Sequence, residues 1–223
     1  MKSKIHEYQR RNIRNISKKL VIIAFVFLSQ MINAQVTRNL GDFDEVKVFD
    51  KINVKLISAS ENKIVITGDR ADEVETVNKN GELKIRMPFP QLLSGDAITI
   101  KLYFKNIESI SASEGSYVSS DTDFKQTMLD LNAKSGAEIN IEIDVDKVNV
   151  KASAGGIIDV SGKATNQDVV ITSGGILKAI DLHTTQTTIS VAAGGKSEIH
   201  ATTLVDAKVK AGGSIFIYGK PKQ

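Results

Sequence analysis

The sequence of 223 residues contains no cysteine and no tryptophan, and only three prolines and three histidines. Without cysteine the chain forms no disulfide, offers no thiolate to a metal and has no cysteine nucleophile. Without tryptophan, any stacking platform for a sugar would have to come from the few tyrosines and phenylalanines. These absences remove many of the side chains that build catalytic and metal sites.

Catalytic motifs are equally scarce. The sequence has no G-x-S-x-G elbow, no H-E-x-x-H pair and no P-loop. Its glycine pairs do not match G-x-G-x-x-G, and no helical periodicity follows them that could receive a phosphate. The sequence therefore predicts a protein that is not an enzyme and that carries no cofactor.

Hydrophobic runs are short, and the longest, Leu20 to Leu28, follows a segment with seven lysines and arginines. A basic segment, a nine-residue apolar core and a small residue at Ala34 are typical of a secretory signal peptide. The run is shorter than the roughly 20 residues that a bilayer span requires. We predict a signal peptide over residues 1–34, with cleavage at Ala34 and an uncleaved N-terminal anchor as the alternative. The protein would then be exported to the periplasm, the outer surface or the medium, with no transmembrane segment after cleavage.

Loss of this leader changes the charge balance. The whole chain has a net charge of +3, and removal of seven basic residues and one acid leaves −3. No basic stripe with interleaved aromatic residues exists after residue 34. The pI of about 8.9 is therefore not the signature of a nucleic-acid-binding protein.

Glycine recurs regularly in the second half of the chain. The first residue of each small pair lies at spacings of 21, 19, 19, 20 and 18, at Gly115, Gly136, Gly155, Gly174, Gly194 and Gly212. The next residue is always small: Ser116, Ala137, Gly156, Gly175, Gly195 and Gly213. A fixed period of about 20 residues indicates stacked repeats.

Apolar and polar residues alternate on both sides of each glycine, as in half-buried strands. The positions three residues before it are all apolar: Ala112, Ala133, Ala152, Ile171, Val191 and Val209. A unit of about 20 residues buries its apolar face only by stacking on its neighbours. We therefore predict an all-β fold, a β-solenoid with corner glycines, over residues 106–223. An antiparallel sandwich or propeller is the alternative, but the repeats lack the Asn-Gly turns that such hairpins favour.

Residues 35–105 show strands without the glycine register, so we expect an irregular β-rich entry region, or one continuous domain over 35–223. Asn80-Gly81 separates two alternating runs and predicts a β-hairpin. The segment Met87 to Asp96 holds two of the three prolines and predicts an exposed loop.

Three features together resemble a known family: the signal peptide, the opening "FDEVKVFDKINVKLISASENKIVITGD" with "VETVNKNGELKIRM", and the run of "AS-G" and "GG" repeats. Residues 38–219 are similar to the putative auto-transporter adhesin, head GIN domain family, common in secreted and envelope proteins of Bacteroidetes. The resemblance implies an all-β solenoid with an adhesive or binding role in the cell envelope. It implies no catalytic residues.

Few side chains suggest a ligand site. Glu142, Asp144 and Asp146 share one strand face and form a weak candidate for Ca²⁺, although successive outward residues lie about 6.6 Å apart. His183 and His200 are separated by slightly less than one repeat period, which assigns them to different positions, so we expect two exposed surface histidines, with a metal pair as the alternative. Candidate ligand-contact aromatics are Tyr103, Tyr117, Phe216 and Tyr218.

The sequence favours a non-enzymatic secreted or envelope protein that acts as an adhesin-like binding or structural module. Its partner would be a surface polysaccharide or protein, and no nucleic acid. Two alternatives stay open. One is a structural solenoid that associates with itself, and the other is a carbohydrate-active β-helix enzyme.

Overall fold

In the computed structural model, residues 35–223 are described, and they lie within one compact unit. The predicted signal peptide lies outside the described residues. These residues form 15 strands of one continuous hydrogen-bonded sheet, with no helix among them. The N-terminal strands are β1 (Val36–Asn39), β2 (Glu45–Val48), β3 (Asn53–Ser58), β4 (Lys63–Thr67), β5 (Glu75–Lys79), β6 (Glu82–Arg86) and β7 (Thr99–Phe104). The repeat strands are β8 (Ser109–Ala112), β9 (Tyr117–Ser120), β10 (Phe124–Lys134), β11 (Glu138–Ser153), β12 (Ile157–Ile171), β13 (Ile176–Ala192), β14 (Lys196–Lys210) and β15 (Ser214–Tyr218).

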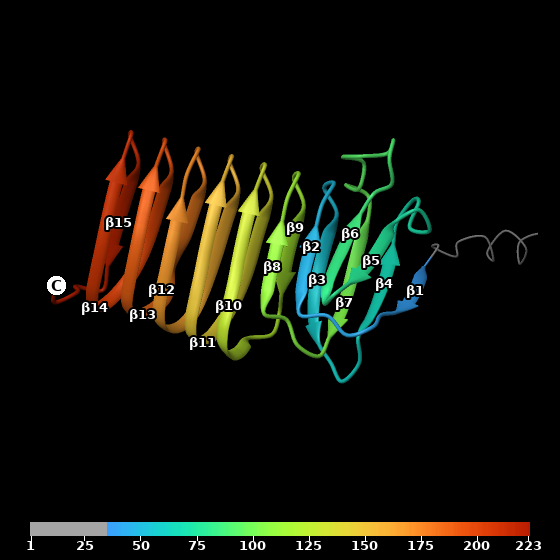
Figure 1. Ribbon diagram of the computed structural model, residues 1–223, viewed down its shortest axis with the longest axis horizontal. Helices are drawn as coiled ribbons and strands as arrows, with labels where there is room; N and C mark the ends of the chain where they lie inside the picture. Colours follow the sequence, from blue (N-terminus) through green and yellow to red (C-terminus); the bar gives the residue numbers. More distant parts are fainter. Residues whose placement is uncertain (1–34) are drawn as a thin grey trace, which may run out of the picture. The chain divides into compact units, whose positions relative to one another are not determined.

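From β10 to β15 the repeat strands stack in parallel, each on the next, and β8 and β9 pair in parallel with β10 and β11 (Figure 1). Ile139 pairs with Ile158, and Ile158 pairs with Leu177. Residues one repeat apart therefore occupy equivalent positions in neighbouring coils. All three side chains are buried at 0% exposure. Parallel stacking around one apolar interior confirms the predicted β-solenoid.

Each coil closes with a tight turn at its glycine. In the coil of Gly155, the amide of Gly156 donates to the carbonyl of Ser153 at 2.9 Å, and the two central residues have φ of +47° at Ala154 and +73° at Gly155. Two successive left-handed residues define a type I′ turn. The solenoid therefore uses the turn expected of antiparallel hairpins, built with alanine, serine or glutamate instead of asparagine.

The two glycines of a pair have different roles. A Cβ at Gly155 would meet nothing within 4 Å, so this residue is required for its positive φ alone. A Cβ at Gly156 would lie 2.2 Å from the carbonyl oxygen of Ala133 in the preceding coil. The second glycine thus allows two backbones to approach, which is the tighter constraint.

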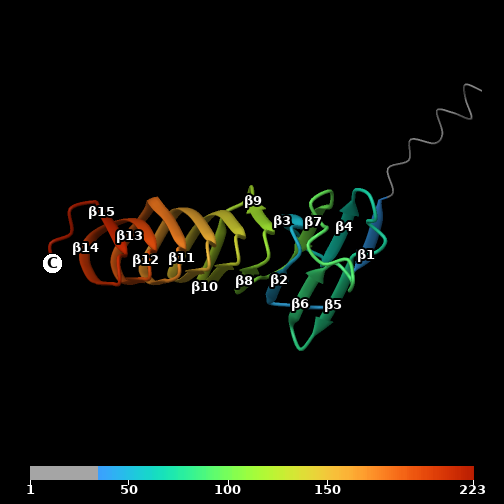
Figure 2. The same cartoon turned by 90° about the horizontal axis from the view of Figure 1, so that it is seen from above.

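On the side opposite the turns, β11 to β14 pass from one face of the solenoid to the other as continuous strands, and Figure 2 shows this curvature from above. We call this bend the arch. Gly162 of β12 lies near it with φ of +102°, where a Cβ would be 2.1 Å from the carbonyl oxygen of Ile143. The arch therefore also depends on close contact between backbones of neighbouring coils.

The entry region continues the stack and then ends it. Strands β2 and β3 pair in parallel with β8 and β9, as β6 and β7 do with β2 and β3. Beyond them β4 runs antiparallel to β7, β1 to β4, and β5 to β6. The β5–β6 pairing confirms the hairpin predicted at Asn80-Gly81. Antiparallel strands thus cap the N-terminal end of the solenoid.

The loop after β6 is exposed at its tip, as predicted. Phe89 is 85% exposed, and Leu92 and Leu93 are about half exposed. Asp50, which is 1% exposed, fixes the loop because its carboxylate accepts hydrogen bonds from the amides of Met87 and Leu93, both at 3.0 Å. The loop is therefore anchored at its base while its apolar tip faces solvent.

Candidate binding groove

A shallow groove of about 490 Å³ follows the arch across β10 to β14. It is lined by Gln126, Asp144, Val145, Asp146, Lys163, Ala164, Thr165, His183, Thr184, Thr185 and Thr202. We call this surface the arch groove. Because the coils stack in register, side chains at equivalent positions of successive coils form rows along the groove.

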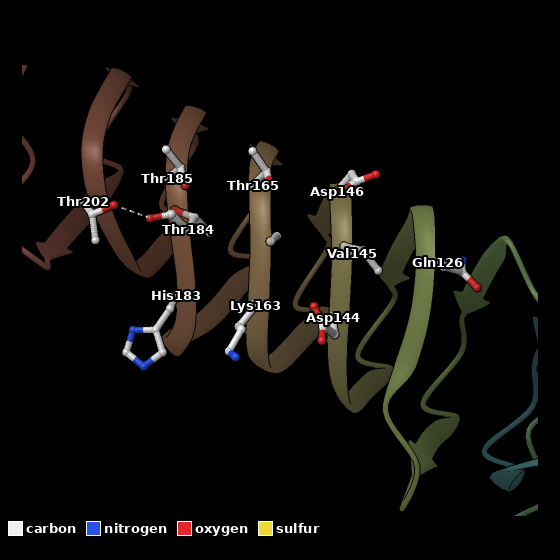
Figure 3. Close-up of a pocket in the computed structure, with 11 residues that line it drawn as sticks. Gln126, Asp144, Val145, Asp146, Lys163, Thr165, His183, Thr184, Thr185 and Thr202 are labelled. Carbon is white, nitrogen blue, oxygen red and sulfur yellow. Dashed lines mark hydrogen bonds between the residues drawn. The ribbon is translucent and has the colours of Figure 1, made fainter.

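Two outward rows of polar side chains border the groove (Figure 3). One contains Asp144, Lys163 and His183, which the strand register places side by side. The other contains Asp146, Thr165 and Thr185, each two residues further along its strand. Successive coils lie about 4.8 Å apart, so the groove offers charged and hydroxyl groups at a regular interval.

Between these rows, Val145, Ala164 and Thr184 point inward and are buried. Thr184 belongs to a buried polar cluster, in which its hydroxyl lies 2.9 Å from that of Thr187, and Thr187 donates to Gln167 Oε1 at 3.3 Å. The Nε2 group of Gln167 is buried and has no hydrogen-bond partner among residues 35–223. Alternation alone did not reveal this cluster, because the segment around Thr184 and Thr187 is polar on both faces.

The three predicted carboxylates all lie on β11 and all face outward. Asp144 and Asp146 line the arch groove, whereas Glu142 lies beside Ser161 of the next coil. Among the described residues, no three or more histidine, aspartate or glutamate side chains gather closely enough to hold a metal ion. The structure therefore adds no ligand to the weak Ca²⁺ candidate.

Neither histidine is buried, as expected, but their expected placement at different positions was wrong. His183 and His200 pair directly across β13 and β14, with their Nδ1 atoms 3.2 Å apart. Their rings are 4.4 Å apart between centroids and nearly perpendicular, at 87°. A change of register in β13 brings them together, which a constant period does not predict.

The four candidate aromatics do not form one platform. Tyr103 lies on β7 with the Lys63 ammonium 4.9 Å from its ring centroid, and Tyr117 lies on β9. Phe216 and Tyr218 lie on β15 and are 47% and 41% exposed. Lys196 Nζ is 5.3 Å from the centre of the Phe216 ring. Only the last two share a strand, and their role in ligand contact stays a prediction.

The main charge cluster with a shifted pKa lies in the N-terminal cap. Lys47 binds Glu82 and Glu45, and Lys84 binds Glu82 at 2.8 Å. Hydrogen bonds from Lys47 and Lys84 lower the pKa of Glu82 to about 2, and those from Glu82 and Glu45 raise the pKa of Lys47. This cluster holds β2 beside β6 and lies apart from the arch groove, with which it shares no residue.

These coils, wound around one apolar interior, define a β-solenoid of parallel strands that ends in antiparallel strands on its N-terminal side. Residues 42–221 match the model of the putative auto-transporter adhesin, head GIN domain, and the chain belongs to this family. The resemblance seen in the sequence is thereby confirmed.

Solved structures share this fold. A putative adhesin from Bacteroides fragilis aligns with a TM-score of 0.77 at 19% identity, covering 85% of this chain and 90% of that one. A putative adhesin from Parabacteroides distasonis aligns at 0.64 and 21%, covering 84% and 94%. A putative lipid binding protein from the same species aligns at 0.60 and 15%, covering 84% and 97%. No curated protein matches the sequence significantly.

Family and fold together support a non-enzymatic, adhesin-like module. Within residues 35–223, no helix has both the length and the apolar character needed to cross a membrane.

Proposed function

We propose that the protein is exported and acts as an adhesin-like binding module that holds an extended surface polysaccharide in the arch groove. The observation that carries this proposal is the pair of polar rows along the groove, which repeat from coil to coil (Figure 3). A polymer also repeats its hydroxyl groups at regular intervals, so one chain could make the same hydrogen bonds to several coils. A surface protein strand is the alternative ligand.

The chemistry of the groove suits a polar, flexible ligand better than an apolar one. Thr165 and Thr185 are exposed and offer hydroxyl groups that both donate and accept hydrogen bonds. Lys163 and Asp144 add one charge of each sign in the neighbouring row. Individually such contacts are weak, and repetition along the groove would supply avidity.

The proposal is tested with a glycan array and with binding to purified envelope polysaccharides. We expect the wild-type protein to bind a polysaccharide, and the double variant K163A/T185A to lose at least about tenfold in affinity, since it removes two polar contacts worth about 1 kcal/mol each. The matched control is K151A/T188A, which alters two exposed residues of β11 and β13 that do not line the arch groove.

Absence of binding to any polysaccharide, or equal loss in both double variants, would contradict the assignment to the arch groove. Protease treatment of intact cells tests the exported location separately. We expect the protein to be digested if it faces the medium, and to be protected until the outer membrane is opened if it resides in the periplasm.

A structural role through self-association is a second candidate, favoured by the C-terminal coil. Val209 and Ile217 occupy inward positions of the coil pattern but are 52% and 46% exposed. The tail covers part of this end, because Lys222 and Gln223 donate to the carbonyl of Thr203 at 3.0 and 3.1 Å. Light scattering over a range of concentrations distinguishes the candidates, since self-association predicts a mass that rises with concentration.

A further inference from the structure

In the histidine pair, two imidazoles, the side chains that most often bind transition metals, meet directly. His183 and His200 point their Nδ1 atoms toward each other at 3.2 Å; His183 is exposed and His200 is half-buried. His183 also lines the arch groove, in the row of Asp144 and Lys163 (Figure 3). Any small ion in solvent therefore has access to both imidazoles.

A local irregularity in β13 creates the pair. Ala179 pairs with Ile199, and the next paired residues are His183 and His200, so residues 180–182 have no partner in β14. A regular continuation would have placed Ile180 beside His200. This β-bulge re-aims the strand at the arch, as bulges commonly do near binding sites.

Further contacts fix both backbones around the pair. The Thr184 hydroxyl donates to the carbonyl of His200 at 2.8 Å, and the Thr202 hydroxyl donates to the carbonyl of Thr184 at 3.1 Å. The His200 ring packs against Gly219, where a Cβ would lie 2.8 Å from His200 Cε1. The imidazoles are therefore held close together before any ligand binds.

The distance between the two nitrogens fits a shared metal ion. Two nitrogens bound to one tetrahedral Zn²⁺ at about 2.0–2.1 Å are separated by about 3.3 Å. Imidazole suits Zn²⁺, Ni²⁺ and Cu²⁺, with Cu²⁺ bound most tightly in this series. With two protein ligands, the remaining coordination positions would face the groove and be filled by water or by a group of a bound molecule.

We propose that His183 and His200 form an exchangeable two-histidine site for a divalent transition metal at the end of the arch groove. This proposal is independent of polysaccharide binding, because it concerns the protein and the metal alone. It predicts a 1:1 complex in which both Nδ1 atoms coordinate the ion. The same nitrogen separation also fits a direct imidazole–imidazole hydrogen bond, so the experiment must separate the two arrangements.

Few other side chains of this protein compete for a transition metal in a titration, since the sequence has no cysteine and only three histidines. The full chain is prepared with a histidine-free affinity tag and with H6A, which leaves His183 and His200 as its only histidines. Calorimetric titration with CuCl₂ and with ZnCl₂ measures affinity and stoichiometry. Electron paramagnetic resonance of the Cu²⁺ complex reports the number of nitrogen ligands.

We expect one bound ion per chain and a spectrum with two imidazole nitrogens. H183A and H200A should each weaken binding by at least roughly 100-fold, because the second imidazole acts at high effective concentration. The double variant should bind no more tightly than either single variant, because it retains neither imidazole. The control K178A changes an exposed residue of β13 and should bind as the parent does.

Both histidines are at the surface, so we expect the alanine variants to fold, and circular dichroism checks this. The proposal is overturned if the parent shows no saturable 1:1 binding, which would leave the direct hydrogen bond as the arrangement of the pair. It is also overturned if either single histidine variant retains the parent affinity, or if K178A loses affinity as the histidine variants do.

Discussion

The two glycines of the turn after β11 allow the solenoid to be tested with single methyl groups. Gly156→Ala introduces a Cβ that would lie 2.2 Å from the Ala133 oxygen and 2.4 Å from the Ala133 carbonyl carbon. Both atoms belong to backbone that is hydrogen-bonded within the stack, so no side-chain rotation relieves the overlap. Gly155→Ala introduces a Cβ with nothing within 4 Å, and only the φ of +73° opposes it.

These observations give different magnitudes for two adjacent substitutions. An alanine in the left-handed region costs about 1 kcal/mol relative to glycine, which we expect for Gly155→Ala. Overpacking against fixed backbone costs about 3 kcal/mol or more, which we expect for Gly156→Ala. For a domain of this size, 1 kcal/mol corresponds to about 2–4 °C in Tm. The Tm should therefore fall by about 2–4 °C at Gly155 and by about 6–12 °C at Gly156.

Differential scanning calorimetry and urea unfolding measure both variants. The pair Gly174 and Gly175 provides an independent replicate, because a Cβ at Gly174 meets nothing within 4 Å and one at Gly175 would lie 2.3 Å from the Ala152 oxygen. Ala137→Gly is a control at the same position as Gly156, one coil earlier, and should lower stability only slightly. If Gly155→Ala proved as costly as Gly156→Ala, the distinction between conformational and contact roles would be refuted.

Three further substitutions should raise stability. Ser197 is fully buried in the column of Leu177 and Ile215, and its hydroxyl has no hydrogen-bond partner in the described part of the chain. Ser197→Val should therefore increase the free energy of unfolding in urea by about 1–2 kcal/mol, and a decrease would contradict the absence of a partner. Ala154 has φ of +47°, a conformation that asparagine adopts more readily than alanine. Ala154→Asn should therefore increase the free energy of unfolding by about 0.5–1 kcal/mol, and no increase would argue against a type I′ turn. Burial and the nearby Asp50 charge raise the pKa of Glu114, so its ionised form is disfavoured in the folded state. Glu114→Gln should therefore raise the Tm at pH 7, and this gain should disappear as the pH falls below 4.5, the ordinary pKa of a glutamate. A gain that does not depend on pH would show that ionisation of Glu114 is not its cause.

The sequence contained enough information for the coil but not for the arch. The glycine period and the alternation of residues such as Ile139 and Asn140 predict stacked strands, because both patterns follow from backbone geometry that every coil repeats. The reason for Gly156 lies in a contact with the preceding coil, which spacing alone does not reveal. The repeat pattern predicts that Gly155→Val displaces the turn. In the structure a Cβ at this position meets nothing within 4 Å, and the positive φ of +73° is what opposes a side chain there.

The histidine pair shows why the candidate site was harder to predict. The period of the corner glycines places His183 beside residues 201–203, and only the unpaired residues 180–182 move it beside His200. Bulges follow from local packing and leave no fixed motif in a single sequence. The spacing between the two histidines was visible, but nothing in the sequence indicated that it corresponds to direct pairing.

The parallel stacking also has a mechanical consequence. In the second half of the chain, each coil is hydrogen-bonded only to the coil before it and the coil after it, as β14 is to β13 and β15. A force applied to the C-terminus would load the hydrogen bonds of one coil at a time, from β15 backward, while the antiparallel cap at the other end stays closed. An attachment made through such a molecule would lengthen in steps of about one coil under tension and would dissipate the load before the cap opened.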